Sequence, residues 1–314
     1  MDITIVIPTF NRKDLLKITL GSIFHGPMSQ THVIVVDNGS TDGTSSFLDS
    51  FVRSHPTVTY TTEKQRCASA ARNKGLSLVN TTWVYFFDSD DEFEDIPHDW
   101  DKSADLIAFP TRQKVGNSIS IRANKPVADP AVHIINGMLS TQSMIFRTAW
   151  LRKIGGWNTK CYVWDDWELG ARALMSAPKL QWITSKAYHV INVHPDSLTG
   201  PSMKSRYKLQ LSTLAQILDY TNRTKSPVMA NCRKALLFRT FILSGKLLYE
   251  GDKKASAICH TFIYENFGRK PSGYKIGWIL EQYTATGGRG AWKIALWIIT
   301  RRTSHEDFAD RRIQ

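Results

Sequence analysis

A short hydrophobic stretch that ends in a cluster of acids constrains this chain more than any other feature. Residues 83–92 are WVYFFDSDDE, so residues typical of a buried strand run directly into an acidic turn. Carboxylates this close together repel one another, and they are costly to bury unless a cation or hydrogen-bond donors neutralise them. The stretch therefore predicts either a divalent metal site at the end of a strand, for which Mg²⁺ or Mn²⁺ suits the oxygen ligands, or a solvated acidic turn.

The first hundred residues alternate between strand patterns and helix patterns. Strands are predicted at residues 3–8, 33–36, 58–60 and from residue 83, and helices at residues 13–24, after residues 41–42 and at residues 68–78. Buried strands that alternate with helices favour a parallel sheet covered on both faces. Ligands of such sheets bind beyond the carboxyl ends of the strands, so residues 9–12, 37–40 and 88–91 are predicted to share one edge.

Beyond residue 95 the pattern is looser. A strand is predicted at residues 104–109, a hairpin at 112–122, a strand at 141–147, a helix at 163–175 and a strand at 187–193. Helical patterns dominate from residue 203 onward. We therefore expect an α/β domain over residues 1–200 and a mainly helical region over residues 201–314.

Charge supports the same division. The 314-residue chain has a net charge of +12, yet residues 1–200 hold 20 basic and 20 acidic residues while residues 201–314 hold 20 and 8. A basic C-terminal region suggests contact with an anionic surface. Four cysteines without a CxxC pair, no leader and no long apolar run favour a cytoplasmic protein, soluble or peripheral on the membrane.

Seven short motifs follow one another along the chain. They are VIPTFNR at 6–12, VVDNGSTDGT at 35–44, ARNKG at 71–75, DSDD at 88–91, GGW at 155–157, WDDWELGAR at 164–172 and HPDSLT at 194–199. In this order they resemble family 2 glycosyltransferases with the GT-A fold, over residues 3–199. The resemblance implies a Rossmann-like, mostly parallel sheet with helices on both faces, here followed by a helical C-terminal region.

The resemblance also implies roles for the polar residues of the sheet edge. A UDP-sugar would be bound by Pro8, Thr9, Arg12, Asp37, Arg72, Asp88 and Ser89, and a Mn²⁺ or Mg²⁺ ion by Asp90, Asp88 and His194. A carboxylate at Asp37 can accept the N3 hydrogen of uracil, although Asp37 beside Asn38 and Gly39 also suits a plain turn. His189 competes with His194 as the histidine of the site.

Catalysis would fall to the second acidic motif. Asp166 matches the family's catalytic base, and its neighbour Asp165 is the other candidate, because an acceptor hydroxyl needs a carboxylate to take its proton. Acids also favour the first turn of a helix without any catalytic role. Trp164 and Gln142 are the predicted sugar or acceptor contacts, and we expect Trp167 in the core.

The predicted function is a metal-dependent, inverting transfer of a sugar from UDP to a hydroxyl of a glycan, with a lipid-linked acceptor in polysaccharide synthesis. Transfer to a polyprenyl phosphate, or a non-catalytic scaffold that only binds a UDP-sugar, are the alternatives. No nucleic-acid partner is expected, since residues 1–200 are neutral and no nucleic-acid motif is present. The tryptophan-rich basic segment after residue 274 suits either an anionic membrane or the surface of a packed helical subdomain.

Overall fold

Strands and helices alternate in the N-terminal part of the chain. The computed structural model describes residues 2–26, 28–122, 126–184, 189–193, 205–223 and 226–303. The first elements are β1 (Ile3–Thr9), α1 (Lys13–Phe24), β2 (His32–Asp37), α2 (Thr44–Ser54), β3 (Val58–Thr62), α3 (Ala68–Leu78) and β4 (Trp83–Phe86). The strands and helices predicted from the sequence pattern are therefore confirmed in this part, with ends displaced by a few residues.

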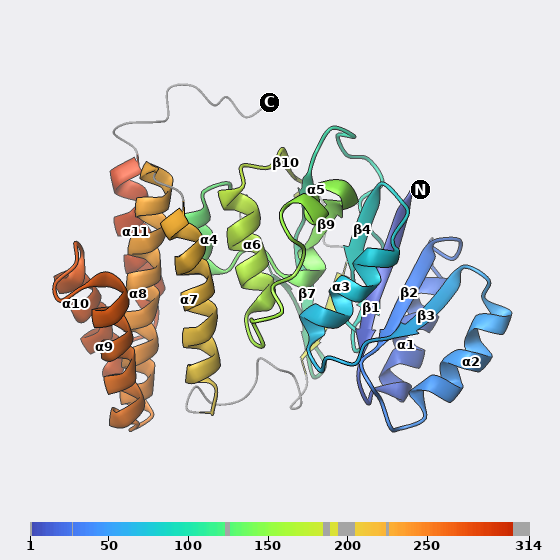
Figure 1. Cartoon of the computed structure of the whole chain (residues 1–314), viewed down its shortest axis with the longest axis horizontal. Helices are drawn as coiled ribbons and strands as arrows, with labels where there is room; N and C mark the ends of the chain where they lie inside the picture. The colour runs from blue at the N-terminus through green and yellow to red at the C-terminus, as the bar shows by residue number, and fades with distance from the viewer. Residues whose placement is uncertain are drawn as a thin grey trace. The chain divides into compact units, whose positions relative to one another are not determined.

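The main sheet is mostly parallel and carries helices on both faces, as predicted. Its strand order is β10-β6-β9-β4-β1-β2-β3, and Figure 1 shows β1, β2 and β3 side by side. Alternate β1 residues Ile3, Ile5 and Ile7 belong to the core that includes buried leucines of α1 and α2. On the opposite face α3 approaches so closely that a Cβ on Gly75 would lie 2.3 Å from Cγ1 of Val6.

The antiparallel member of the main sheet starts later than its sequence pattern predicted. Residues 141–147 were expected to be one strand, but a 3₁₀ turn, η1 (Thr141–Ser143), precedes β9 (Met144–Arg147). Ser140 and Ser143 form a capping box, which stabilises the turn in place of extended backbone. Strand β9 then pairs antiparallel with β4 and with β6 (Leu106–Ala108), while β10 (Leu180–Trp182) lies parallel to β6.

A second, four-stranded sheet has the order β5-β11-β7-β8. The predicted hairpin is present as β7 (Thr111–Val115) and β8 (Ser118–Arg122). The strand predicted at residues 187–193 is present as β11 (His189–Val193), and residues 187 and 188 lie outside the described residues. The short strand β5 (Glu92–Phe93) was not predicted. It pairs antiparallel with β11, with His189 opposite Phe93, and so connects the acidic turn to a segment almost a hundred residues away.

The remaining elements are helices. They are α4 (Pro130–Asn136), α5 (Thr148–Lys153), α6 (Asp165–Met175), α7 (Tyr207–Arg223), α8 (Pro227–Tyr249), α9 (Lys253–Phe267), α10 (Tyr274–Ala285) and α11 (Ala291–Thr303). Ser226 caps α8 and Asp252 caps α9 through side-chain hydrogen bonds to backbone amides. In the part of the chain that the structure describes, no helix has the length and hydrophobicity to span a bilayer.

The chain divides into two compact units. One comprises Met1–Pro126, Leu139–Leu169 and Ser176–Gly200, and the other Val127–Met138, Gly170–Met175 and Pro201–Gln314. The boundary near residue 200 stays a prediction, since the second unit also includes α4 and the end of α6. All four cysteines are buried free thiols, as expected.

Candidate active site

The carboxyl ends of β1 and β2 form the first side of the site. Thr9 and Asp37 are paired in the sheet register, and both are buried. Asp37 accepts hydrogen bonds from the amide of Ser40 and the hydroxyl of Ser45, both at 3.0 Å, so it holds the turn that follows β2. The hydroxyl of Thr9 is buried without a hydrogen-bond partner among the described residues. Buried polar atoms are seldom left unpaired, so this hydroxyl is available to a ligand.

Two acids of the DSDD motif are each neutralised by an arginine. Asp88 accepts from Arg72 at 2.7 Å on one oxygen and from the amide of Gln142 at 2.6 Å on the other. Asp90 pairs with Arg12 at 2.7 Å. The acceptors fix the orientation of the Gln142 amide, because only its nitrogen can donate to a carboxylate. Arginines and other hydrogen-bond donors thus offset the repulsion between the neighbouring carboxylates of this turn.

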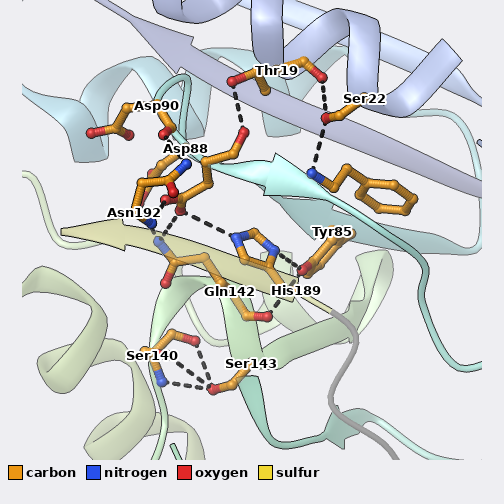
Figure 2. Close-up of polar contacts among 12 residues, drawn as sticks. Thr19, Ser22, Tyr85, Asp88, Asp90, Ser140, Gln142, Ser143, His189 and Asn192 are labelled. Atoms are coloured by element: carbon orange, nitrogen blue, oxygen red, sulfur yellow. Dashed lines mark hydrogen bonds and ion pairs between the residues drawn. The ribbon is translucent and has the colours of Figure 1, made fainter. Parts of the chain in front are cut away.

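Asp91 points away from solvent into a closed hydrogen-bond network. Its side chain contacts the ring of His189 at 3.1 Å, the amide of Gln142 at 3.0 Å and the backbone amide of Asn192 at 2.9 Å. The other ring nitrogen of His189 lies 2.8 Å from the hydroxyl of Tyr85. Figure 2 shows His189 between Tyr85 and the acidic turn, with Gln142 alongside.

The hydrogen-bond roles in this network determine where its proton lies. The hydroxyl of Tyr85 donates to the backbone carbonyl oxygen of Gln142, so it accepts from Nδ1–H of His189. A neutral imidazole then presents an acceptor at Nε2, and Asp91 must supply the proton between them. Burial lowers the pKa of His189 to about 3, and burial together with the charges of Asp88 and Asp90 raises the pKa of Asp91 well above its usual value.

Arg72 connects the two acidic motifs. Its guanidinium donates to Asp88 and to Asp165, both at 2.7 Å, and lies 4.4 Å over the ring of Trp157. Burial alone would lower the pKa of Arg72, but the two carboxylates raise it, so the side chain stays charged. One buried arginine therefore holds the end of β4 and the start of α6 together.

The start of α6 distinguishes its two acids. Asp165 accepts from Arg72 and from the hydroxyl of Ser69 on one oxygen and from the amide of Asp166 on the other. Asp166 accepts from the amide of Trp167 at 2.7 Å, and both acids are part-exposed. The helix begins at Asp165 and not at residue 163, because Trp164 adopts a left-handed backbone with φ of 59°. Such a conformation costs a bulky residue energy and is concentrated at functional sites.

The aromatic residues of this region differ in exposure. Trp167 is buried, as expected, and Trp157 is also core, with its ring 5.1 Å from that of Phe86. Trp164 is half-buried and packs edge-on against Trp167. Gln142, a predicted sugar or acceptor contact, is buried and faces Asp88 and Asp91.

The carboxylates of the acidic turn fit a divalent ion whose remaining coordination positions are filled by a bound phosphate ligand and water. Asp88 and Asp90 offer carboxylate oxygens at a strand end, while buried Asp91 points the other way. Among the described residues no group of three or more His, Cys, Asp or Glu side chains is arranged to hold a metal. Mg²⁺ and Mn²⁺ accept such a site, because they take one or two carboxylates together with phosphates and water. His194, the third predicted ligand, lies outside the described residues.

Sequence reasoning missed most of the support beneath the acidic turn. Tyr85, Gln142 and Asn192 each bond to the turn or to His189, although they lie far apart in the sequence. Only Gln142 and His189 had been singled out, and for other roles. The signal was the apolar run before Asp88, in which a tyrosine places a hydroxyl in the core and requires a buried partner.

Comparison with known proteins gives a family match over the first part of the chain. The model of "Glycosyl transferase family 2" matches residues 4–104. "Glycosyltransferase GlyA" of Streptococcus pneumoniae is 33% identical over 92 residues, which are 29% of this chain and 13% of GlyA. The matched stretch makes up between 13% and 37% of the first three curated relatives.

Solved structures are similar over nearly the whole chain. Staphylococcus aureus TarS 1–349 in complex with UDP-GlcNAc has a TM-score of 0.67 and 16% identity. The match covers 97% of this chain and 92% of the TarS chain. Mannosyltransferase PcManGT from Pyrobaculum calidifontis, in complex with GDP-Man and Mn²⁺, has a TM-score of 0.56 and 17% identity, with 98% and 88% covered. At these identities the likeness is one of fold, and it confirms the predicted GT-A architecture.

Proposed function

We propose that this chain, whose residues 4–104 match the model of glycosyltransferase family 2, transfers a sugar from a UDP-sugar to a glycan hydroxyl with inversion. The observation that carries the proposal is the ion-paired bridge from Asp88 through Arg72 to Asp165. Through it, the edge proposed to bind the donor lies next to Asp166, the proposed base. A transferase that acts by direct displacement needs these two elements on either side of one reacting carbon.

On the donor side, the nucleotide binds beyond β1 and β2. We propose that Asp37 accepts the N3 hydrogen of uracil while Pro8 and the unpaired hydroxyl of Thr9 line the pocket. The diphosphate lies toward Arg12 and Arg72, whose guanidinium groups suit phosphate oxygens. Asp88, with the adjacent buried Ser89, contacts the ribose. The TarS complex with UDP-GlcNAc supports a uridine donor, and PcManGT makes guanosine the alternative to test.

On the acceptor side, Asp166 is the proposed general base. The acceptor oxygen attacks the anomeric carbon, its proton passes to the Asp166 carboxylate, and the bond to the diphosphate breaks with its electron pair on the leaving oxygen. Attack opposite the leaving group inverts the anomeric centre. Asp165 is the weaker candidate, since its ion pair with buried Arg72 and its hydrogen bond from Ser69 commit it to the bridge between the two acidic motifs. Half-buried Trp164 is the proposed sugar contact.

A divalent ion, Mn²⁺ or Mg²⁺, would be held by Asp90 and Asp88. When bound it stabilises the negative charge that develops on the departing UDP. Asp90 now pairs with Arg12, so metal binding requires this arginine to move from the carboxylate toward the diphosphate. Ion binding and donor binding should then depend on each other.

The acceptor in this proposal is a lipid-linked glycan of polysaccharide synthesis at the inner face of the membrane. The strong excess of basic residues after residue 200 supports an acceptor that carries an anionic lipid diphosphate. Such an acceptor keeps the growing chain at the membrane while a peripheral enzyme extends it.

The proposal is tested by UDP release from a panel of UDP-sugars and GDP-mannose, with a lipid-linked glycan extract as acceptor. Mn²⁺, EDTA, Asp90→Ala and Asp166→Asn are compared, with Asp14→Asn, an exposed acid of α1, as the matched control. We expect turnover with one UDP-sugar, lost with EDTA and in both site variants and retained in the control.

Other outcomes would replace the proposal by a specific rival. Activity that survives Asp166→Asn would favour transfer to a polyprenyl phosphate, whose ionised oxygen needs no base. Binding of UDP with no sugar consumed under any acceptor condition would favour a binding protein without catalysis. Turnover with GDP-mannose alone would overturn the proposed contact between Asp37 and uracil.

A further inference from the structure

Helices α10 and α11 each have one buried face and one exposed aromatic face. α10 packs on α8 through Gly277, Leu280 and Thr284, and α11 packs on α4 and α8 through small and aliphatic residues, Ala291, Ala295 and Ile299. The sequence pattern had left open a membrane surface or a packed subdomain. Among the described residues, the buried side chains of each helix lie on one side, and the side chains opposite them are exposed.

The outward sides are unusually apolar for a surface. The exposed fractions are 50% for Trp278, 58% for Ile279, 38% for Trp292, 44% for Ile294 and 55% for Trp297. Single exposed hydrophobic residues are normal, but clusters of large ones mark binding surfaces. On α10, Trp278 and Ile279 stand one turn from Lys275, and on α11, Trp297 stands one turn from both Lys293 and Arg301.

The exposed charged residues of α10, of the turn after it and of α11 have a single sign. Lys275, Arg289, Lys293 and Arg301 are exposed, and the Arg301 guanidinium lies 4.1 Å over the Trp297 ring. Glu281 is the only acid among residues 274–303, and it is buried. A second copy of the same face would place cations against cations with no carboxylate between them, so the surface fits an anionic partner.

We propose that the outward faces of α10 and α11, here called the α10–α11 face, bind an anionic lipid bilayer. Tryptophan rings favour the boundary between headgroups and acyl chains, and lysine and arginine favour anionic headgroups. The two helices would lie along the bilayer surface without spanning it. This proposal rests on the residues of α10 and α11 alone, so it does not depend on the proposed sugar transfer.

The test is co-sedimentation of the full chain with two kinds of vesicle, phosphatidylcholine alone and phosphatidylcholine mixed with phosphatidylglycerol. We expect binding to the mixed vesicles only, weakened by salt. Lys275→Gln with Lys293→Gln should reduce the affinity about fivefold for each cation removed. Trp278→Ser with Trp297→Ser should reduce it at least about tenfold, because two large apolar groups no longer enter the lipid.

The matched controls lie on α9, where Lys253, Lys254 and Tyr264 are also exposed. Lys253→Gln with Lys254→Gln, and Tyr264→Ser, should leave vesicle binding within about twofold of the unmodified chain. Three results would overturn the proposal: no binding to anionic vesicles, equal losses in face and control variants, or oligomers that dissociate in the tryptophan variant. Binding of UDP, measured in parallel, separates loss of the surface from loss of the nucleotide site.

Discussion

Each unit of the chain contains a buried acid hydrogen-bonded to a histidine, and the two pairs behave differently. Asp91 and His189 are both buried, with side-chain exposures of 3% and 0%, whereas buried Glu281 pairs with His260, which is 38% exposed. Burial lowers the pKa of His189, while the hydrogen bond to Glu281 raises the pKa of His260. Enclosure therefore makes one histidine a fixed hydrogen-bond partner and leaves the other able to titrate.

The surroundings of the pairs explain what each stabilises. His189 lies between Tyr85 and Asp91, and Gln142 continues the network from Asp91 to Asp88 at the candidate site. Glu281 instead accepts from Ser244 and contacts His260, which joins α8, α9 and α10 to one another. The first network positions the acidic turn of the candidate site, and the second holds helices together.

Loss of the enclosed histidine should have the largest effect. His189→Ala leaves a cavity and removes one buried hydrogen-bond partner each from Tyr85 and Asp91, so we expect the free energy of unfolding to fall by about 3 kcal/mol. His260→Ala should cost less than about 1 kcal/mol, because water replaces an exposed partner. Urea unfolding measures both. If His189→Ala does not fold, Tyr85→Phe is the milder test, and equal losses at the two histidines would contradict the comparison.

The link from the enclosed pair to Asp88 can be cut at Gln142. Gln142→Leu replaces the amide by an apolar side chain of similar volume and removes the donor to Asp88 and Asp91, so Asp88 loses one of its two restraints. We expect UDP affinity, measured by calorimetry, to fall about tenfold, or about 1.4 kcal/mol. Gln181→Leu is the matched control, since that glutamine bonds only the loop at Asp101 among the contacts described. Equal affinities would show that Gln142 does not position Asp88.

These two networks also mark what sequence could and could not predict. Local patterns gave the alternating elements of the sheet, because strand hydrophobicity and helix periodicity are read within about a dozen residues. The expected convergence of residues 9–12, 37–40 and 88–91 follows from parallel topology, and Arg12 does contact Asp90. The roles of the individual site residues remain predictions.

Long-range pairing was not accessible in the same way. Strand β5 has only two residues, Glu92 and Phe93, too few for a period to appear, yet its pairing with β11 places His189 beside Asp91. The capped turn before Met144 was hidden by an alternating pattern that suits a strand equally well. The contact between Gln142 and Asp88 was not predicted, because nothing in the local sequence of Gln142 indicates a carboxylate partner more than fifty residues away.

A smaller effect is expected when the second pair loses its serine. Ser244→Ala removes a donor from buried Glu281, which then depends on His260 alone among the side chains that contact it here. We expect a loss of about 1 kcal/mol in urea unfolding and a stronger dependence of stability on pH. Ser256→Ala is the control, because Ser256 contacts Ser244 but leaves the bond to Glu281 in place. A larger loss for Ser256→Ala would show that helix packing, and not the carboxylate, is what Ser244 supports.

The smallest effect, and the most direct contrast, lies in the titration of the two rings. The folded-state pKa of His260 is raised above its ordinary 6.5, so the folded chain binds this proton more tightly than the unfolded chain does. Its contribution to stability is therefore fully present below pH 6.5 and is lost as the pH rises through the raised pKa. Because the ring is partly exposed, we expect the change to be below about 1 kcal/mol.

Histidine NMR can test both rings in one experiment, with His189→Gln and His260→Gln used to assign the signals. We expect the His260 signal to titrate above pH 6.5 and the His189 signal to stay that of a neutral ring until the pH approaches 3, since burial lowers its pKa to about that value. A His189 ring that becomes protonated near pH 6 would mean that solvent reaches the network beneath Asp88. In that case enclosure could not explain the difference between the pairs, and Gln142 would no longer connect Asp88 to a rigid support.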